Sequence, residues 1–271
     1  MIWIRRAAIL LLVAIALSGL LAPLLAPYTY NEQDRESANA APSPKYLMGT
    51  DELGRDRWSR LLYGTSVSAL LAPAAALCSI LIALFVSSLT AFGRPALSHF
   101  IAGFTTICLS LPWIFLFIIL RSKLPLDSGP ATLIAWTFGL MGVAGWAWPA
   151  RVFTASIAEI RQSGWLMQAR AAGISPPRIA VRYAWPHLWT LAAAQLYILI
   201  PAYVLSEASL GLLGLGVPVP IPSWGNLLND LNHPGIVDIV RANPYILAPL
   251  GLLIIVMICL ETMAPARETA L

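Results

Sequence analysis

The segment that organises the chain is polar and separates two hydrophobic runs; it reads 168-QARAAGISPPRIAVRYAWP-186. Alanine and arginine favour a helix up to Ala172, and Gly173 tolerates the left-handed backbone that ends many helices. Ser175 can cap a second helix, with Pro176 at its first position, where a missing N–H costs nothing. The pattern predicts a compact helix–break–helix loop that the neighbouring membrane segments hold in water.

The composition indicates a membrane protein. Hydrophobic residues make up 58% of the chain and charged residues only 11%, whereas a soluble domain of this length carries roughly twice that share of charge. The net charge of +4 is spread over short loops without an aromatic-interleaved basic patch, which argues against nucleic-acid binding. The three cysteines, Cys78, Cys108 and Cys259, lie in apolar segments, so we expect neither a disulfide framework nor a metal site.

The apolar runs predict an all-α integral membrane protein with about six transmembrane helices. Residues 7–27 follow Arg5 and Arg6 and are closer in length to the roughly 20 residues of a membrane span than to the shorter core of a signal peptide. Further spans are expected at residues 66–92, 100–120, 131–150 and 187–206, and a shorter one at 245–260. An even number of spans places both termini on one side, which we expect to be the cytoplasm.

These spans divide the chain into four parts. Residues 1–27 form the first transmembrane helix, and residues 28–65 an external linker with an amphipathic helix. Residues 66–265 form a five-helix core whose cytoplasmic loop covers residues 151–186. Residues 266–271 are a C-terminal tail.

A second polar stretch precedes the second expected span and reads 47-LMGTDELGRDRWSRLLYG-64. Thr50 or Asp51 can cap a turn that Gly54 relaxes. Hydrophobic side chains between Trp58 and Leu62 then share one face, which predicts a helix lying in the membrane interface. The acidic residues lack the alternating oxygen ligands of a calcium loop, so a hydrogen-bonded turn is the better interpretation.

A third stretch follows the fifth expected span and reads 207-EASLGLLGLGVPVPIPSWGNLLND-230. It has a helix end rich in glycine and then a loop stiffened by proline. We expect Trp224 to anchor this loop at the interface. Glu207 is an acid close to membrane depth; both a structural hydrogen bond and a role in a transport path remain open for it.

Together, the three stretches resemble permease subunits of ABC importers, specifically the second permease of the dipeptide/oligopeptide/nickel group. The first resembles the loop that such permeases present to their ATPase, although the usual Glu-Ala-Ala is here Met167-Gln168-Ala169. That departure puts in doubt any salt bridge from the glutamate to the ATPase, but not the helix–break–helix shape. By resemblance, the ATPase-coupling loop comprises Met167, Gln168, Ala169, Arg170, Ala172, Gly173, Ile174, Ser175, Pro176, Arg178, Arg182 and Pro186. The other family motif positions are Gly49, Thr50, Asp51, Gly54, Arg55, Asp56, Glu207, Gly214, Gly216, Trp224 and Gly225.

The resemblance implies an ABC importer type I permease fold and import of a small solute, of peptide or nickel type, by alternating access. It also implies the cytoplasmic (inner) membrane of a prokaryote, a second permease subunit, cytoplasmic ATP-binding subunits, an external solute-binding protein and surrounding lipid, but no nucleic acid. The sequence has no Gly-x-x-x-x-Gly-Lys-[Ser/Thr] phosphate loop. We therefore expect no enzyme and no cofactor in this chain, ATP being bound by a partner subunit.

Two other classes of membrane protein would carry different sequence patterns. A secondary transporter driven by an ion gradient would favour several ionisable residues at mid-membrane and an inverted internal repeat. A membrane-embedded hydrolase would need a catalytic constellation of side chains. The sequence shows neither pattern.

Overall fold

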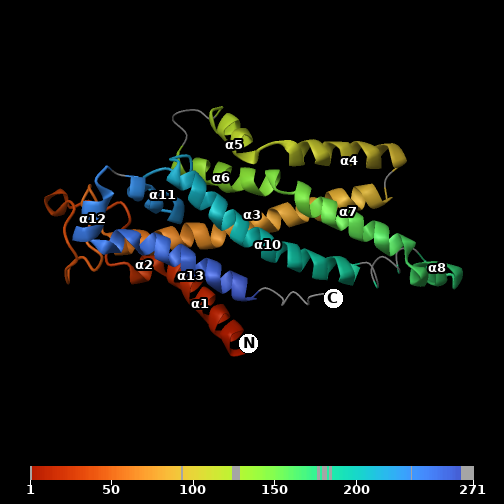
Figure 1. Cartoon of the computed structure of the whole chain (residues 1–271), viewed down its shortest axis with the longest axis horizontal. Helices are drawn as coiled ribbons and strands as arrows, with labels where there is room; N and C mark the ends of the chain where they lie inside the picture. The colour runs from red at the N-terminus through yellow and green to blue at the C-terminus, as the bar shows by residue number, and fades with distance from the viewer. Residues whose placement is uncertain are drawn as a thin grey trace. The chain divides into compact units, whose positions relative to one another are not determined.

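The computed structural model describes residues 2–92, 94–123, 129–175, 178, 182, 185–232 and 234–263. Within these residues the regular elements are helical, which confirms the all-α prediction (Figure 1). In chain order they are α1 (Ile2–Leu20), α2 (Ala22–Leu25), η1 (Arg35–Ser37), α3 (Arg57–Phe92), α4 (Pro95–Ser110), α5 (Trp113–Arg121), α6 (Pro130–Ala144), α7 (Ala147–Gln162), α8 (Gly164–Ala171), α10 (Trp185–Leu212), α11 (Trp224–Asn229), η3 (Asp230–Asn232), α12 (Ile236–Ala242), η4 (Pro244–Leu247) and α13 (Ala248–Met263).

Five helical stretches among the described residues are long and apolar enough to cross a membrane: Trp3–Leu20, Arg57–Thr90, Pro130–Gln162, Trp185–Leu212 and Pro244–Met263. Helix α4 is also apolar but shorter, with 16 residues. Large hydrophobic side chains on these helices are exposed, among them Leu10 at 69%. In a lipid bilayer such exposure is favourable, and the helices satisfy their own backbone polar groups.

The span expected at residues 100–120 is not one continuous helix. Helix α4 ends at Ser110 and α5 begins at Trp113. Pro112 lacks an N–H and pushes the residue before it out of the helical region. Leu111 is accordingly extended, with φ −81° and ψ 128°.

The expected interfacial helix before the second span is likewise absent as a separate element. Residues 57–65 are the first turns of α3, which continues without a break to Phe92. Leu61 and Leu62 are buried, and so is the charged Arg60. This segment therefore has its hydrophobic side packed inside the protein, where it is not available to lie in a membrane interface.

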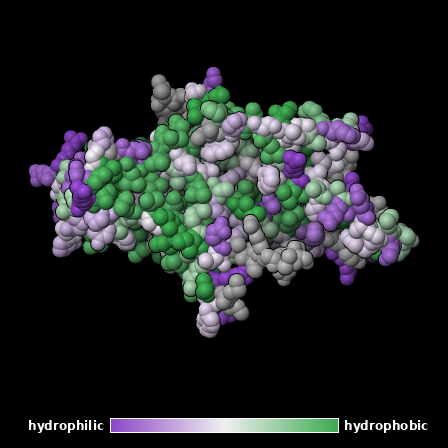
Figure 2. Space-filling view, in the orientation of Figure 1, coloured by the Kyte–Doolittle hydropathy of each residue, from purple (hydrophilic) through white to green (hydrophobic). Residues whose placement is uncertain are grey.

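The chain forms two compact units. Unit 1 comprises Met1–Ala72, Pro125–Thr137 and Pro201–Leu271, and unit 2 comprises Pro73–Leu124 and Phe138–Ile200. In unit 1, α1 packs along α13 (Figure 1). The side chain missing at Gly19 lets α1 approach α3 closely, since a Cβ there would lie 2.6 Å from the backbone nitrogen of Ser66. Figure 2 shows hydrophobic residues over α1 and α13, and hydrophilic residues gathered at the end of unit 1 formed by residues 28–56 and α12.

Unit 2 uses small residues for close helix packing. Helix α4 packs against α7. The Ser79 hydroxyl on α3 donates to the carbonyl of Gly142 at 2.5 Å, and the Ser87 hydroxyl donates to that of Ala150 at 3.0 Å. A Cβ on Gly142 would be 3.1 Å from the Cβ of Cys78. Hydroxyl groups and small residues at helix contacts are typical of membrane bundles, where close backbone approach replaces the hydrophobic effect.

A polar turn precedes α3 in unit 1 and is held by Asp34. Its carboxylate accepts hydrogen bonds from the Tyr46 hydroxyl at 2.8 Å, the Ser37 hydroxyl at 2.9 Å and the Lys45 ammonium at 3.1 Å. These contacts, the Tyr46 bond first, lower the pKa of Asp34 from 3.8 to about 2. The ionised carboxylate is therefore favoured by folding of the turn.

We expect acid to loosen this turn. Because the pKa of Asp34 is lowered on folding, the ionised carboxylate stabilises the folded turn. This stabilisation is complete above the unfolded pKa of 3.8 and is lost as the pH falls through about 2. Amide hydrogen exchange over residues 34–46 should accelerate across this range, beyond the intrinsic pH effect. Asp34→Asn is the control and should remove the pH-dependent step; unchanged protection in the unmodified chain would contradict the assignment.

Candidate functional site

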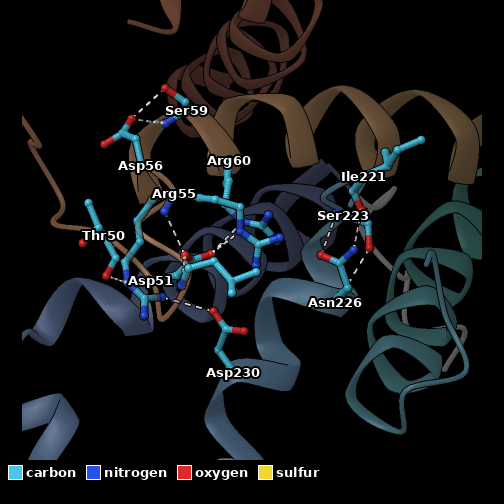
Figure 3. A network of polar contacts seen from close by, with 12 residues as sticks. Thr50, Asp51, Arg55, Asp56, Ser59, Arg60, Ile221, Ser223, Asn226 and Asp230 are labelled. Carbon is cyan, nitrogen blue, oxygen red and sulfur yellow. Dashed lines mark hydrogen bonds and ion pairs between the residues drawn. The ribbon is translucent and has the colours of Figure 1, made fainter. Parts of the chain in front are cut away.

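Two sequence motifs that lie far apart in the chain meet in unit 1. One is the turn before α3, and the other runs from the end of α10 through α11 (Figure 3). We call this contact region the motif junction, and its members are Thr50, Asp51, Arg55, Asp56, Arg57, Ser59, Arg60, Thr65, Ser68, Glu207, Ser223, Trp224, Gly225, Asn226 and Asp230.

Asp51 is the centre of the turn at residues 49–56. Its Oδ1 accepts hydrogen bonds from the backbone N–H groups of Leu53 at 3.0 Å and Arg55 at 2.9 Å. Its Oδ2 accepts the Arg55 Nε at 2.6 Å and lies 3.7 Å from the Nε of Arg60. Both carboxylate oxygens thus have protein partners, so the hydrogen-bonded turn expected from the sequence is what the structure shows.

The start of α3 connects this turn to the second motif. Asp56 caps the helix, since its Oδ2 accepts from the backbone N–H of Ser59 at 2.8 Å and from the Ser59 hydroxyl at 2.6 Å. Arg57 donates through Nε to the carbonyl of Thr50 at 3.1 Å and through Nη1 to Oδ2 of Asp230, also at 3.1 Å. Burial raises the pKa of Asp230, against the opposing charges of Arg57 and Arg60.

Glu207 joins α10 to α3 and α11. It is fully buried, and its Oε2 accepts the Ser68 hydroxyl at 2.9 Å. The backbone N–H of Gly225 points at both carboxylate oxygens, 3.3 Å from each. Ser68 in turn accepts the backbone N–H of Trp224 at 2.9 Å. The contacts favour the structural alternative for Glu207, because each oxygen is engaged by a group that fixes a neighbouring segment.

Glycine permits the close approach of α10 and α11. A Cβ on Gly225 would lie 2.5 Å from the carbonyl oxygen of Glu207 and 3.0 Å from the Cα of Gly211. Gly216 is equally close, with a Cβ position 2.7 Å from the Cα of Gly211, and Gly214 has a positive φ of 70°. Two family motif positions, Gly216 and Gly225, therefore mark close backbone contacts, and Gly214 marks a turn.

Trp224 does not anchor the loop at an interface, contrary to the expectation from the sequence. Its side chain is only 1% exposed, and its Nε1 donates to the Thr65 hydroxyl at 3.1 Å. A tryptophan favours an interface because its N–H needs a polar partner. Here Thr65 on α3 supplies that partner inside the protein, so the indole is buried.

Several residues of the junction were missed from the sequence. Ser223 and Asn226 form a reciprocal cap on α11: the Ser223 oxygen accepts the Asn226 N–H at 3.2 Å, and the Asn226 side-chain oxygen accepts the Ser223 N–H at 2.9 Å. Their spacing is that of a capping box, a local signal that could have been found. Ser68 gave no such signal, because a serine within an apolar helix has many structural uses.

The expected coupling loop lies in unit 2 and is described in part. Helix α8 holds Met167, Gln168, Ala169 and Arg170. It ends where predicted, with Gly173 at φ 76° and the N–H of Ile174 bonded to the carbonyl of Ala169 at 3.1 Å. This bond spans five residues, as in a Schellman motif.

The remaining loop positions are mostly exposed or lie outside the described residues. Met167 is 62% exposed, and Ala172, Ser175, Arg178 and Arg182 are also exposed. Pro176 and most of the expected second helix are outside the described residues. Pro186 lies in the first turn of α10, where a missing N–H is tolerated.

Comparison with known proteins agrees with these features. The family described as binding-protein-dependent transport system inner membrane component matches residues 79–266, and the N-terminal TM domain of oligopeptide transport permease C matches residues 6–42. The chain is 27% identical over 222 residues to the oligopeptide transport system permease protein OppC of Bacillus subtilis, which covers 82% of this chain and 71% of that protein. It is 29% identical over 237 residues to a putative peptide permease protein of Brucella suis (86% and 76% covered) and 26% identical over 268 residues to OppC of Escherichia coli (98% and 85% covered).

The family match extends over more than half of the chain, and the relatives align along most of it. In this family ATP hydrolysis belongs to separate subunits, and the ion-gradient transporter is not favoured. The chain therefore belongs to the binding-protein-dependent transport system inner membrane components, the multi-pass permease subunits of ABC importers with the type I permease fold.

Proposed function

We propose that this permease imports peptides across the cytoplasmic membrane of a prokaryote. The proposal rests on one observation: the chain matches an N-terminal domain described for oligopeptide permeases as well as the common permease domain. Relatives named as oligopeptide, dipeptide and putative peptide permeases support the same class of solute over nickel. Both termini are proposed to lie in the cytoplasm.

The proposed partners are a second permease subunit, cytoplasmic ATP-binding subunits, an external solute-binding protein and the membrane lipid around the permease. Helix α8 and its exposed Met167 support an ATPase contact at residues 167–186, because a short helix with a defined end presents a rigid surface. The chain itself is proposed to need no cofactor and to bind no nucleic acid; ATP is bound by the partner.

The test is purification of the tagged chain from native membranes in mild detergent, followed by reconstitution of the recovered subunits in proteoliposomes. We expect a second permease and an ATPase to be recovered, and peptide uptake to require ATP and the binding protein. Uptake of nickel instead of peptide would overturn the solute class. Recovery of the chain alone, under conditions that preserve other membrane complexes, would overturn the importer assembly.

The proposed mechanism is alternating access. Two helices, α3 and α10, carry a proline at the point where they pass from one compact unit to the other. Helix α3 passes from unit 1 to unit 2 between Ala72 and Pro73, and α10 passes back between Ile200 and Pro201. Proline inside a helix removes a backbone hydrogen bond and weakens its resistance to bending. We infer that α3 and α10 bend at these residues during transport.

We expect Pro201→Ala to lower peptide uptake several-fold while keeping or raising the thermal midpoint of unfolding, because it adds back a helical hydrogen bond. Uptake in proteoliposomes and thermal unfolding in detergent measure the two effects. Pro95→Ala is the matched control and should leave uptake unchanged, since Pro95 occupies the first turn of α4, where no bond is missing. Unchanged uptake by Pro201→Ala would contradict bending at this position.

A further inference from the structure

A small cavity lies inside unit 1 beside the motif junction. Its volume is about 10 Å³, and its charged lining residues are Arg57, Arg60 and Asp230. The wall is completed by Tyr245 and by apolar residues, among them Leu61 on α3 and Ala248 at the start of α13. Space of roughly 10–15 Å³ is what one buried water molecule needs.

Arg60 brings an unsatisfied donor to this cavity. Its side chain is only 5% exposed, and its Nε lies 3.7 Å from Oδ2 of Asp51. That oxygen already accepts the Arg55 Nε at 2.6 Å, so Arg60 holds only a long contact to a shared carboxylate. The Nη1 of Arg60 is buried and has no hydrogen-bond partner among the described residues. A buried donor without an acceptor is unfavourable, and an explanation in the local structure is required.

The charges around the cavity decide which ligand fits. The ligand must accept a hydrogen bond from Arg60 and lie beside the carboxylate of Asp230, which also pairs with Arg57 at 3.1 Å. An anion would be repelled by Asp230, and a cation by the two arginines. Water accepts from an N–H and donates to a carboxylate at the same time. We propose that this cavity binds a single structural water that bridges Arg60 Nη1 and the carboxylate of Asp230.

The bridge has a clear structural consequence. Arg57 already connects α3 directly to Asp230, and Arg60 connects α3 to the turn at Asp51. The water adds a second connection, from Arg60 to Asp230, beside the one that Arg57 makes from the carbonyl of Thr50 in the turn to Asp230. This inference does not depend on which solute the importer carries.

A cavity-filling substitution tests the water by the sign of its effect. Ala248→Val adds two methyl groups at the cavity wall and displaces the water, which leaves Arg60 Nη1 unsatisfied. In the assembled complex we expect the thermal midpoint to fall by about 2–4 °C. In an Arg60→Met background the same change should leave the midpoint unchanged or raise it, because no donor is then stranded. Stabilisation by Ala248→Val in both backgrounds would show a dry cavity and overturn the proposal.

Two further measurements identify the ligand directly. A cryo-EM map of the complex in lipid nanodiscs, at a resolution that shows ordered waters, should contain one peak within about 2.7–3.2 Å of Arg60 Nη1 and of an Asp230 oxygen. Ala248→Val should lack this peak, and its absence from the unmodified complex would overturn the site. Replacing chloride by gluconate should not change the thermal midpoint; a chloride-dependent midpoint would assign the cavity to an anion instead.

Discussion

Glu207→Ala is expected to abolish peptide uptake because the chain no longer folds at the motif junction. The side chain is fully buried and accepts hydrogen bonds from the Ser68 hydroxyl and the Gly225 N–H. Its removal leaves two buried donors, at about 1–3 kcal/mol each, and a cavity that adds about 2–5 kcal/mol. The sum is comparable to the total stability of a typical domain, about 5–15 kcal/mol. The folded fraction, measured by fluorescence-detected size-exclusion chromatography, and peptide uptake should both fall.

Substitutions at the same position separate a structural role from a transport role. Glu207→Gln keeps the shape and one oxygen, but its amide nitrogen faces donors, so we expect a folded fraction between those of the native chain and Glu207→Ala. A Glu207→Gln chain that folds normally but transports nothing would place Glu207 in the transport path. Glu159→Ala on α7 is the matched control: this glutamate is exposed, and its loss should change neither measurement. A native folded fraction for Glu207→Ala would contradict the junction's role.

The membrane class and most helices of this protein were predictable because they depend on local runs of apolar residues. The helix break at Leu111–Pro112 was not predicted, although Pro112 is visible in the sequence. A proline within a span is tolerated when neighbouring helices satisfy the freed carbonyl, and this depends on packing that the sequence does not show. The helix end at Gly173 was predicted correctly, since its geometry involves only nearby residues.

The candidate site was predictable as two separate motifs but not as one junction. Asp51 and Glu207 lie in stretches that drew attention individually, yet their segments are joined by Ser68, Arg57 and Asp230, which have no local signal of that role. Trp224 shows the same limit. Whether an indole N–H finds its partner at a membrane interface or inside the protein depends on where Thr65 lies after folding.

Gly173→Val is expected to reduce uptake to background while the chain remains inserted and folded. Gly173 has a φ of 76°, a region that β-branched residues strongly disfavour. The substitution should break the bond from the Ile174 N–H to the carbonyl of Ala169 and redirect the chain after α8. Uptake, ATP hydrolysis and co-purification of the ATPase, all in the reconstituted complex, measure the loss of coupling. Native uptake by this variant would overturn the coupling proposal for residues 167–186.

Asparagine at the same position distinguishes backbone geometry from side-chain bulk. Among the residues that the structure describes, a Cβ at Gly173 meets nothing within 4 Å, so these residues leave room for a side chain. Asparagine adopts the left-handed region more readily than other residues with a side chain, and Gly173→Asn should keep most of the uptake. Gly173→Ala should fall between asparagine and valine. The three variants differ in backbone strain, but each of them has a Cβ. An equal loss of uptake in all three would therefore mean that the ATPase contacts this position directly and leaves no room for a side chain.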